Sequence, residues 1–300
     1  MNGVVVIDKP NGLTSHDVVN RVRRILGQRS VGHLGTLDPA ATGVLPIVAG
    51  NLTRLAQFYT HAEKIYEGVI RFGFATDTYD ADGEPTTPPC DVHLDADELR
   101  ALAADFQGVI EQVPPPFSAK KIAGVPAYKL ARKKQEVALK AVKVEIKEFD
   151  IVGLEDDRAR FRACVASGTY MRSLAQDLGQ RLGCGAHLES LRRTGVAEFV
   201  VEDAHTLEGL EQAVRQGSAQ DSFVHPRKLL PQFPSVTATD ENVALIRAGR
   251  AVNLPELSRA PLVKVFLGQR ELIAIATRVA GTLFHARIVF PRRNELNIRP

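Results

Sequence analysis

The spacing of apolar residues predicts a strand and then a helix at the start of the chain. Residues 4–7 form a short apolar run that leads through Asp8 into a Lys-Pro-Asn-Gly turn, which is typical of a buried strand over residues 4–8. Thr14 and Asp17 follow with the spacing of a capping box, and apolar residues then recur every three or four positions. This pattern predicts an amphipathic helix that begins after Thr14 and ends at Gly27.

The same patterns predict further elements as far as residue 181. In chain order these are a loop at 28–46, a helix around 52–59, a strand at 64–72, an acidic turn at 76–83, a helix from 95 to about 108, two alternating strands at 142–152 and 158–166, and a helix from about 168 to 181. The two alternating segments flank an acidic turn at 155–157, so we expect them to pair as neighbouring strands.

A change in composition near residue 216 predicts a second domain. Residues 216–234 are rich in polar and turn-forming residues, and the apolar segments beyond them (262–266, 272–276 and 286–290) are short enough to be strands. A length of 300 residues also exceeds that of a usual single domain. We therefore expect one large domain over residues 1–234 and a small module built of strands over residues 235–300.

Charge adds one feature that the totals conceal. The 38 Lys and Arg residues nearly balance the 35 Asp and Glu residues, so the formal charge is only +3. Residues 118–143, however, carry one acid, Glu136, among many basic side chains. The basic residues of this insert are Lys120, Lys121, Lys129, Arg132, Lys133, Lys134, Lys140 and Lys143. Such a run indicates either a contact with phosphates or an ordinary solvated surface.

Composition also argues against several classes of protein. An apolar share of 44% with 24% charged residues is typical of a globular chain and not of a disordered one. The three cysteines form no C-x-x-C pair, which favours a reducing compartment over a disulfide framework or a cysteine zinc site. No two histidines have metal-ligand spacing, and no apolar run is long enough for a signal peptide or a membrane span. We expect a cytoplasmic protein without a metal.

Residues 32–46 are the segment most suited to chemistry. Three glycines and two prolines predict a shaped loop, with a single acid, Asp38, at its centre. Backbone N–H groups and the hydroxyl of Thr36 or Thr42 could hold this carboxylate ionised. The alternative is a plain Asp-Pro turn, because Asp38 and Pro39 form a common turn pair.

This segment resembles the signature of the bacterial tRNA pseudouridine(55) synthases, the TruB-type branch of the pseudouridine synthases. The resemblance covers most of the chain and weakens towards the C-terminus. The other matching motifs are residues 2–10, Lys64-Ile65-Tyr66, residues 76–83, residues 167–172 and residues 183–194. Small departures occur at Phe117, Lys134, Met171 and Ala197, none of which has a chemical role in the family.

The resemblance implies three catalytic residues. Asp38 matches the essential carboxylate of the family, and Arg172 matches the arginine that pairs with it and keeps it ionised through a charge-assisted hydrogen bond. Tyr66 matches the tyrosine that stacks on the target base. Without the resemblance, the sequence pattern predicts that Tyr66 is a core residue of a strand and that Arg172 is a surface residue near the start of a helix.

The resemblance also implies residues that bind the substrate. His33 would stack against the RNA loop, Leu191 would line the pocket, and Asp80 would join the network of Asp38. The remaining substrate-binding residues are Lys9 of the N-terminal motif and Lys133 and Lys134 of the basic insert. Each has a plainer alternative: a loop histidine held by backbone contacts, a core leucine, an aspartate that caps a turn, or a solvated lysine.

The implied fold is α/β (α+β), a pseudouridine synthase fold with a mixed, largely antiparallel sheet and a PUA-like RNA-binding module after it. The implied activity is the isomerisation of the uridine at position 55 of the T-arm of tRNA, by base flipping and carboxylate-assisted cleavage and re-closure of the glycosidic bond. No cofactor, metal, membrane or protein partner is implied, and we expect a monomer. Two alternatives remain, a non-catalytic protein that binds and folds tRNA and a carboxylate-dependent glycosidase or nucleosidase.

Overall fold

The computed structural model describes residues 1–118, 120–122, 124–127, 130 and 139–291. Up to residue 215 its elements are β1 (Gly3–Lys9), α1 (Ser15–Leu26), β2 (Val31–His33), β3 (Thr42–Ala49), the 3-10 helix η1 (Gly50–Phe58), β4 (Lys64–Phe72), α2 (Ala96–Ala104), β5 (Gly108–Gln112), β6 (Lys121–Ile122), β7 (Val125–Pro126), β8 (Val142–Glu155), β9 (Arg158–Val165), α4 (Met171–Leu182), β10 (Ala186–Val196), β11 (Phe199–Val200), η2 (Val201–Asp203) and α5 (Leu207–Arg215). Further along are η3 (Ala219–Ser222), η4 (Pro226–Lys228), β12 (Ser235–Thr237), α6 (Asp240–Arg247), β13 (Val252–Asn253), β14 (Leu262–Leu267), β15 (Glu271–Ala280) and β16 (Leu283–Val289).

The larger sheet is mixed and mostly antiparallel, as expected. Over the described residues it has nine strands, with the order β1-β3-β10-β4-β9-β8-β5, while β2 pairs with β3 and β11 with β10. Among the strands that the structure describes in this sheet, one pair is parallel: β3 joins β10, where Arg192 and Arg193 face Thr42 and Gly43. This join links the N-terminal part of the sheet to the part that carries β4, β9 and β8.

Burial on both faces explains the unbroken apolar run of β1. Val5 and Ile7 point into the main core, whereas Val4 and Val6 point to the opposite face and pack in a second cluster. Strand β9 instead alternates: Ala159, Phe161 and Ala163 are buried on one face, while Arg160 and Arg162 are exposed on the other. A continuous apolar run therefore indicates a strand that is covered on both faces, and an alternating pattern indicates a strand with one face open to water.

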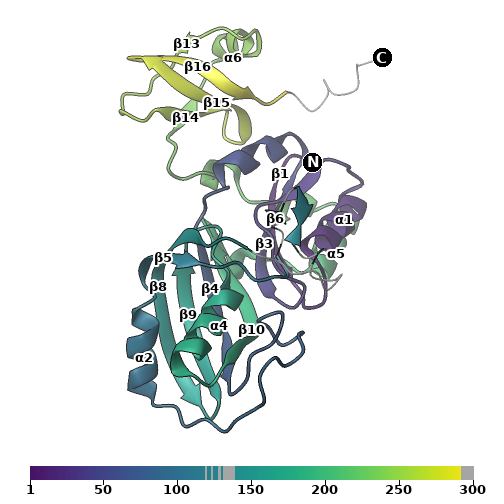
Figure 1. The fold of residues 1–300 in the computed structure, drawn as a ribbon. Helices are drawn as coiled ribbons and strands as arrows, with labels where there is room; N and C mark the ends of the chain where they lie inside the picture. Colours follow the sequence, from purple (N-terminus) through teal and green to yellow (C-terminus); the bar gives the residue numbers. More distant parts are fainter. Residues whose placement is uncertain (119, 123, 128–129, 131–138, 292–300) are drawn as a thin grey trace.

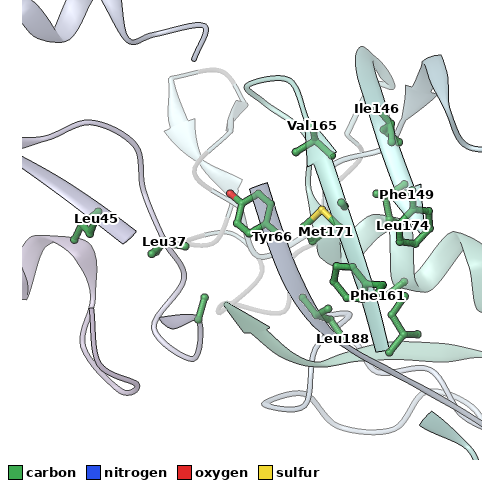
Figure 2. Packing of buried hydrophobic residues seen from close by; sticks show 14 of the residues in the cluster. Leu37, Leu45, Tyr66, Ile146, Phe149, Phe161, Val165, Met171, Leu174 and Leu188 are labelled. Atoms are coloured by element: carbon green, nitrogen blue, oxygen red, sulfur yellow. The ribbon is translucent and has the colours of Figure 1, made fainter. Parts of the chain in front are cut away.

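The helices lie on one face of the larger sheet and close the main core. Helices α1 and α5 cover the β1–β3 part, while α2 and α4 cover the part built from β8, β9, β4 and β10 (Figure 1). Figure 2 shows this core, in which Phe149, Phe161 and Leu174 pack together, and Tyr66 lies beside Met171 on the side towards Leu37. Because the core is continuous from α1 to α4, it fixes the two halves of the sheet relative to each other.

The C-terminal module is a separate five-stranded sheet within the described residues, in the order β12-β14-β15-β16-β13. One face packs on α6 through Val263, Ile273 and Phe284. Phe266 and Ile275, on the other face, belong to the same hydrophobic cluster as residues of η1 and β1. Figure 1 shows this module beside the end of the larger sheet at which the N-terminus lies.

The structure confirms most of the expected elements and corrects three. The capping box of Thr14 and Asp17 and the left-handed Gly27 bound α1, and the strands at 142–152 and 158–166 are the hairpin β8–β9. The expectation of a loop over 28–46 was wrong in part, because β2 and most of β3 lie within it. The helix expected at 52–59 is the 3-10 helix η1, and the module that was expected to contain strands alone also contains α6. No described helix is long and apolar enough to cross a membrane.

Candidate active site

A cavity of about 450 Å³ opens where the loop after β2 meets the segment before α4. Residues 33–38 form one wall and residues 167–172 form another. The rest of the lining comes from Ala56, Tyr59, Thr60, Lys64, Tyr66 and Leu191. This volume is in the range of pockets that hold a ligand the size of a nucleoside. The cavity brings together five of the residues singled out from the sequence: His33, Asp38, Tyr66, Arg172 and Leu191.

An ion pair between Asp38 and Arg172 is the central feature of the cavity wall. The Nε atom of Arg172 lies 2.9 Å from Oδ2 of Asp38. The arginine side chain is 7% exposed and the aspartate side chain 44% exposed, so the guanidinium is fixed in the protein while the carboxylate reaches solvent. A carboxylate that is both paired and accessible can act on a molecule bound in the cavity.

Arg172 is held by three further contacts from two other segments. Its guanidinium donates to the carbonyl oxygen of Thr78 at 3.2 Å and to that of Phe117 at 3.0 Å. Nη1 also lies 3.5 Å from Oδ2 of Asp80. The planar guanidinium is therefore oriented from several sides, and only its Nε atom is directed at Asp38.

Asp80 joins the network through Arg172 and not through Asp38. Its carboxylate also accepts hydrogen bonds from the Thr78 hydroxyl and from the backbone N–H of Asp82. Burial raises the pKa of Asp80, against the opposing effects of the Thr78 hydroxyl and the charge of Arg172. Asp80 lines a second cavity of about 380 Å³, which shares Asp38, Arg172 and Leu191 with the first.

The loop that carries Asp38 is fixed from β10 by the fully buried Arg193. This side chain donates to the carbonyl oxygens of Gly35, Thr36 and Val44 at 3.1, 3.2 and 2.8 Å. Its own strand must approach β3 closely. Gly43 permits this with a φ of 100°, since a Cβ there would lie 2.2 Å from the carbonyl oxygen of Arg193.

The same loop is fixed from its other side by α1 and β1. The Ser15 hydroxyl donates to the carbonyl oxygen of Leu37 at 3.0 Å and accepts from its N–H at 2.8 Å. Lys9 is fully buried, and its ammonium group donates to the carbonyl oxygens of Pro10, Leu13 and Pro39. The residues on both sides of Asp38 are thus held in place, which preorganises the carboxylate.

These contacts change the interpretation of Lys9 and of the threonines near Asp38. The ammonium of Lys9 is occupied by loop carbonyls, and burial lowers its pKa to about 8 although the charge of Asp38 opposes this. Its position favours holding the loop over direct contact with a substrate. Among the described residues, Arg172 and not Thr36 or Thr42 contacts the carboxylate of Asp38.

Tyr66 and His33 present rings to the cavity from different walls. Tyr66 is only 6% exposed and packs in the main core near Met171 (Figure 2), and it also lines the cavity. Nδ1 of His33 accepts a hydrogen bond from the Gly35 N–H at 3.3 Å, and burial lowers the pKa of this imidazole. A neutral imidazole and a phenol ring are both suited to stacking on a nucleobase.

Several site residues were missed by the sequence reasoning. Arg193 lies within the matched motif at residues 183–194, but nothing in the local pattern shows that it reaches back to the loop of Asp38. Lys64 lines the cavity beside Gly35, and burial, with a further contribution from the charge of Arg193, lowers its pKa to about 8. Lys133 and Lys134 lie outside the described residues. Within the described part of the chain no group of His, Cys, Asp and Glu side chains could hold a metal ion.

Comparison with protein families gives two matches, which adjoin in the sequence. The N-terminal domain of TruB family pseudouridylate synthases matches residues 23–171, and the C-terminal domain of tRNA pseudouridylate synthase B matches residues 172–231. The first match ends one residue before Arg172, so the ion pair joins one matched region to the other.

Curated relatives match over nearly the whole chain. The chain is 50% identical to the tRNA pseudouridine synthase B of Solibacter usitatus, over 96% of this chain and 100% of that protein. It is 38% identical to the protein of the same name from Bacillus cereus, over 92% of each chain. A third such protein, from Dehalococcoides mccartyi, is 36% identical over 98% of this chain and 99% of its own.

Solved structures share the fold. A chain in the crystal structure of a Cbf5-Nop10-Gar1 complex has a TM-score of 0.72 and 26% identity, with 97% of this chain and 85% of that chain covered. A chain in the structure of an H/ACA RNP bound to a substrate RNA containing 2′-deoxyuridine has a TM-score of 0.71 and 25% identity, with 97% and 86% covered. Both alignments therefore extend over nearly all of this chain.

Proposed function

The chain belongs to the TruB family of pseudouridylate synthases, and we propose that it converts the uridine at position 55 of the T-arm of tRNA to pseudouridine. Isomerisation of uridine to pseudouridine is the activity of the family. The observation that carries the proposal is the Asp38–Arg172 ion pair on the wall of a cavity of nucleoside size. The name shared by the curated relatives supports tRNA as the substrate.

The reaction breaks the bond between N1 of uracil and C1′ of ribose and forms a bond between C5 and C1′. C5 loses its proton, N1 gains one, and the composition of the RNA is unchanged. Asp38 would assist by attacking the sugar, by attacking the base or by removing a ribose proton. All three routes require a carboxylate that can reach the nucleotide, and the pairing of Asp38 with Arg172 and the 44% exposure of its side chain support this role.

The target uridine would enter the cavity after rotating out of the RNA stack. A base must leave its stack before an enzyme can reach its glycosidic bond, and protein rings can replace the lost stacking. Tyr66 lines the same cavity as Asp38, and we propose that its ring stacks on the uracil. His33 and Leu191 would contact the nucleotide from the rim, because both line the same cavity.

Affinity for tRNA would come from surfaces outside the cavity. We propose that the basic insert at 118–143, including Lys133 and Lys134, contacts phosphates. The module over residues 235–300 would bind RNA in the manner of a PUA domain. We further propose that the protein works as a cytoplasmic monomer, which is compatible with its three free cysteines, Cys90, Cys164 and Cys184.

The most direct test of the proposed function is a pseudouridine map of unmodified tRNA after incubation with the pure protein. We expect one modified position, in the T-arm loop, and an RNA of unchanged mass. Release of free uracil with an abasic ribose would indicate a glycosidase instead. Binding of tRNA without any pseudouridine would indicate a non-catalytic RNA-folding protein.

A further inference from the structure

The side chain of Gln112 forms a two-point clamp on the residue before α4. Gln112 is the last residue of β5 and is completely buried. Its Nε2 donates to the carbonyl oxygen of Tyr170 at 3.1 Å, and its Oε1 accepts from the N–H of Tyr170 at 2.8 Å. The backbone N–H and carbonyl oxygen of Tyr170 are therefore both hydrogen-bonded to the amide side chain of Gln112.

This clamp acts where α4 lacks a cap of its own. Tyr170 is the N-cap residue of α4, and its side chain makes no capping hydrogen bond. A helix without a side-chain cap loses one of the interactions that stabilise its first turn. The hydrogen bonds from Gln112 instead fix the backbone of the N-cap residue itself from a distant strand, and Arg172 lies only two residues beyond Tyr170.

The residues that follow Gln112 extend the same contact. The Ser173 hydroxyl donates to the carbonyl oxygen of Val113 at 2.7 Å. The guanidinium of Arg172 donates to the carbonyl oxygen of Phe117 at 3.0 Å. The segment from Gln112 to Phe117 thus contacts the start of α4 along its length. Gln112, at one end, binds Tyr170, and Phe117, at the other end, binds Arg172.

We propose that Gln112 is a positioning residue for the reaction, which acts through Tyr170 and Arg172 on the carboxylate of Asp38. It does not line the cavity, so it does not touch the substrate. Loss of the clamp frees the first turn of α4 and with it the direction of the Arg172 guanidinium. A displacement of about 1 Å at a positioning group can cost about a hundredfold in rate. This role rests on the function proposed above.

The test compares Gln112→Leu and Gln112→Glu with the wild-type protein on the same RNA. Gln112→Leu keeps the approximate volume and removes both hydrogen bonds. We expect its single-turnover rate to fall about ten- to hundredfold while its RNA affinity stays within about twofold. Leu178→Ala is the matched control, because Leu178 is fully buried in α4 and away from the ion pair. It should lower Tm and leave the rate, measured well below Tm, unchanged.

Gln112→Glu adds a readout that lost stability alone would not produce. An ionised glutamate still accepts from the Tyr170 N–H but repels the Tyr170 carbonyl oxygen, whereas a protonated one can make both hydrogen bonds. A buried carboxyl group is protonated more easily than an exposed one. The rate of Gln112→Glu relative to wild type should therefore rise as pH falls from about 8 to about 5.5, and that of Gln112→Leu should not.

A wild-type rate for Gln112→Leu would overturn the positioning role. The role would also be overturned if Leu178→Ala lost as much rate as Gln112→Leu for the same decrease in Tm. If Gln112→Leu fails to fold, Gln112→Glu decides, and a flat ratio across the pH range would count against the proposal. Absence of pseudouridine with the wild-type protein would instead overturn the proposed function, so the two failures are separable.

Discussion

Replacing Arg172 with lysine tests whether the geometry of the ion pair, and not merely its positive charge, supports the reaction. The guanidinium reaches Asp38, Asp80 and the carbonyl oxygens of Thr78 and Phe117 at the same time. A lysine ammonium is one point charge and cannot span these four oxygens. Arg172→Lys therefore keeps the positive charge beside Asp38 and removes the fixed orientation of the hydrogen-bond donors.

The expected loss follows from the contacts that a lysine cannot replace. A hydrogen bond to a charged group contributes about 1.5–3 kcal/mol, which corresponds to roughly 10- to 150-fold in rate if it acts in the transition state. The Asp38 side chain is 44% exposed, so water weakens the interaction and places the effect towards the lower end. We expect Arg172→Lys to lower the single-turnover rate about ten- to fiftyfold.

The assay is pseudouridine formation at saturating enzyme, with tRNA affinity measured separately. Arg71→Lys is a suitable control, since Arg71 pairs with Asp157 at 2.9 Å and does not line either cavity at Asp38. It should keep the wild-type rate. If Arg172→Lys stays within twofold of wild type, or loses only RNA affinity, the reasoning about orientation is refuted.

Three further predictions concern the loop, the cavity and the insert. Gly43→Ala forces a Cβ against the backbone of β10 at a φ of 100°, so we expect a loss of about 2–5 kcal/mol in the free energy of unfolding; Gly12→Ala, with open space around it, should cost less in the same denaturation assay. Burial lowers the pKa of His33 below 6.5, so as pH falls the imidazole binds a proton in the unfolded chain before it does so in the folded protein. The stability that neutral His33 contributes above pH 6.5 is therefore lost at lower pH. The difference in Tm between wild type and His33→Asn should shrink from pH about 7.5 to about 5, and a constant difference would contradict this. Lys133→Ala with Lys134→Ala should weaken tRNA binding and flatten its dependence on salt, and an unchanged salt slope would count against phosphate contacts.

Elements with local signals could be predicted from the sequence. Helix α1 has its capping box, its apolar face and its terminal glycine within fourteen residues, and all three appear in the structure. The hairpin β8–β9 likewise has its alternation and its turn in one continuous segment. Such elements need no knowledge of what they pack against.

Elements that depend on distant partners could not be predicted in this way. Strands β2 and β3 lie in a segment whose glycines and prolines are typical of a loop, and β3 is a strand because β1 and β10 pair with it on either side. Gly43 looks like a loop residue in the sequence, yet at this position the backbones of β3 and β10 approach too closely to leave room for a Cβ.

The candidate site shows the same limit. Asp38 and Arg172 are 134 positions apart, and only the resemblance to a family, not their spacing, brought them together before the structure did. Arg193 and Gln112 act through contacts with backbone groups far away in the chain. A side chain that holds a distant backbone leaves no periodic pattern in the sequence, so residues of this kind become visible only in the folded protein.

The central claim is that the Asp38 carboxylate performs the isomerisation, and Asp38→Asn tests it most directly. The asparagine keeps the size of the side chain and removes its charge. With unmodified tRNA and equal protein concentrations, we expect the variant to bind tRNA as the wild type does and to form no pseudouridine. Equal pseudouridine yields from the two proteins would contradict the account.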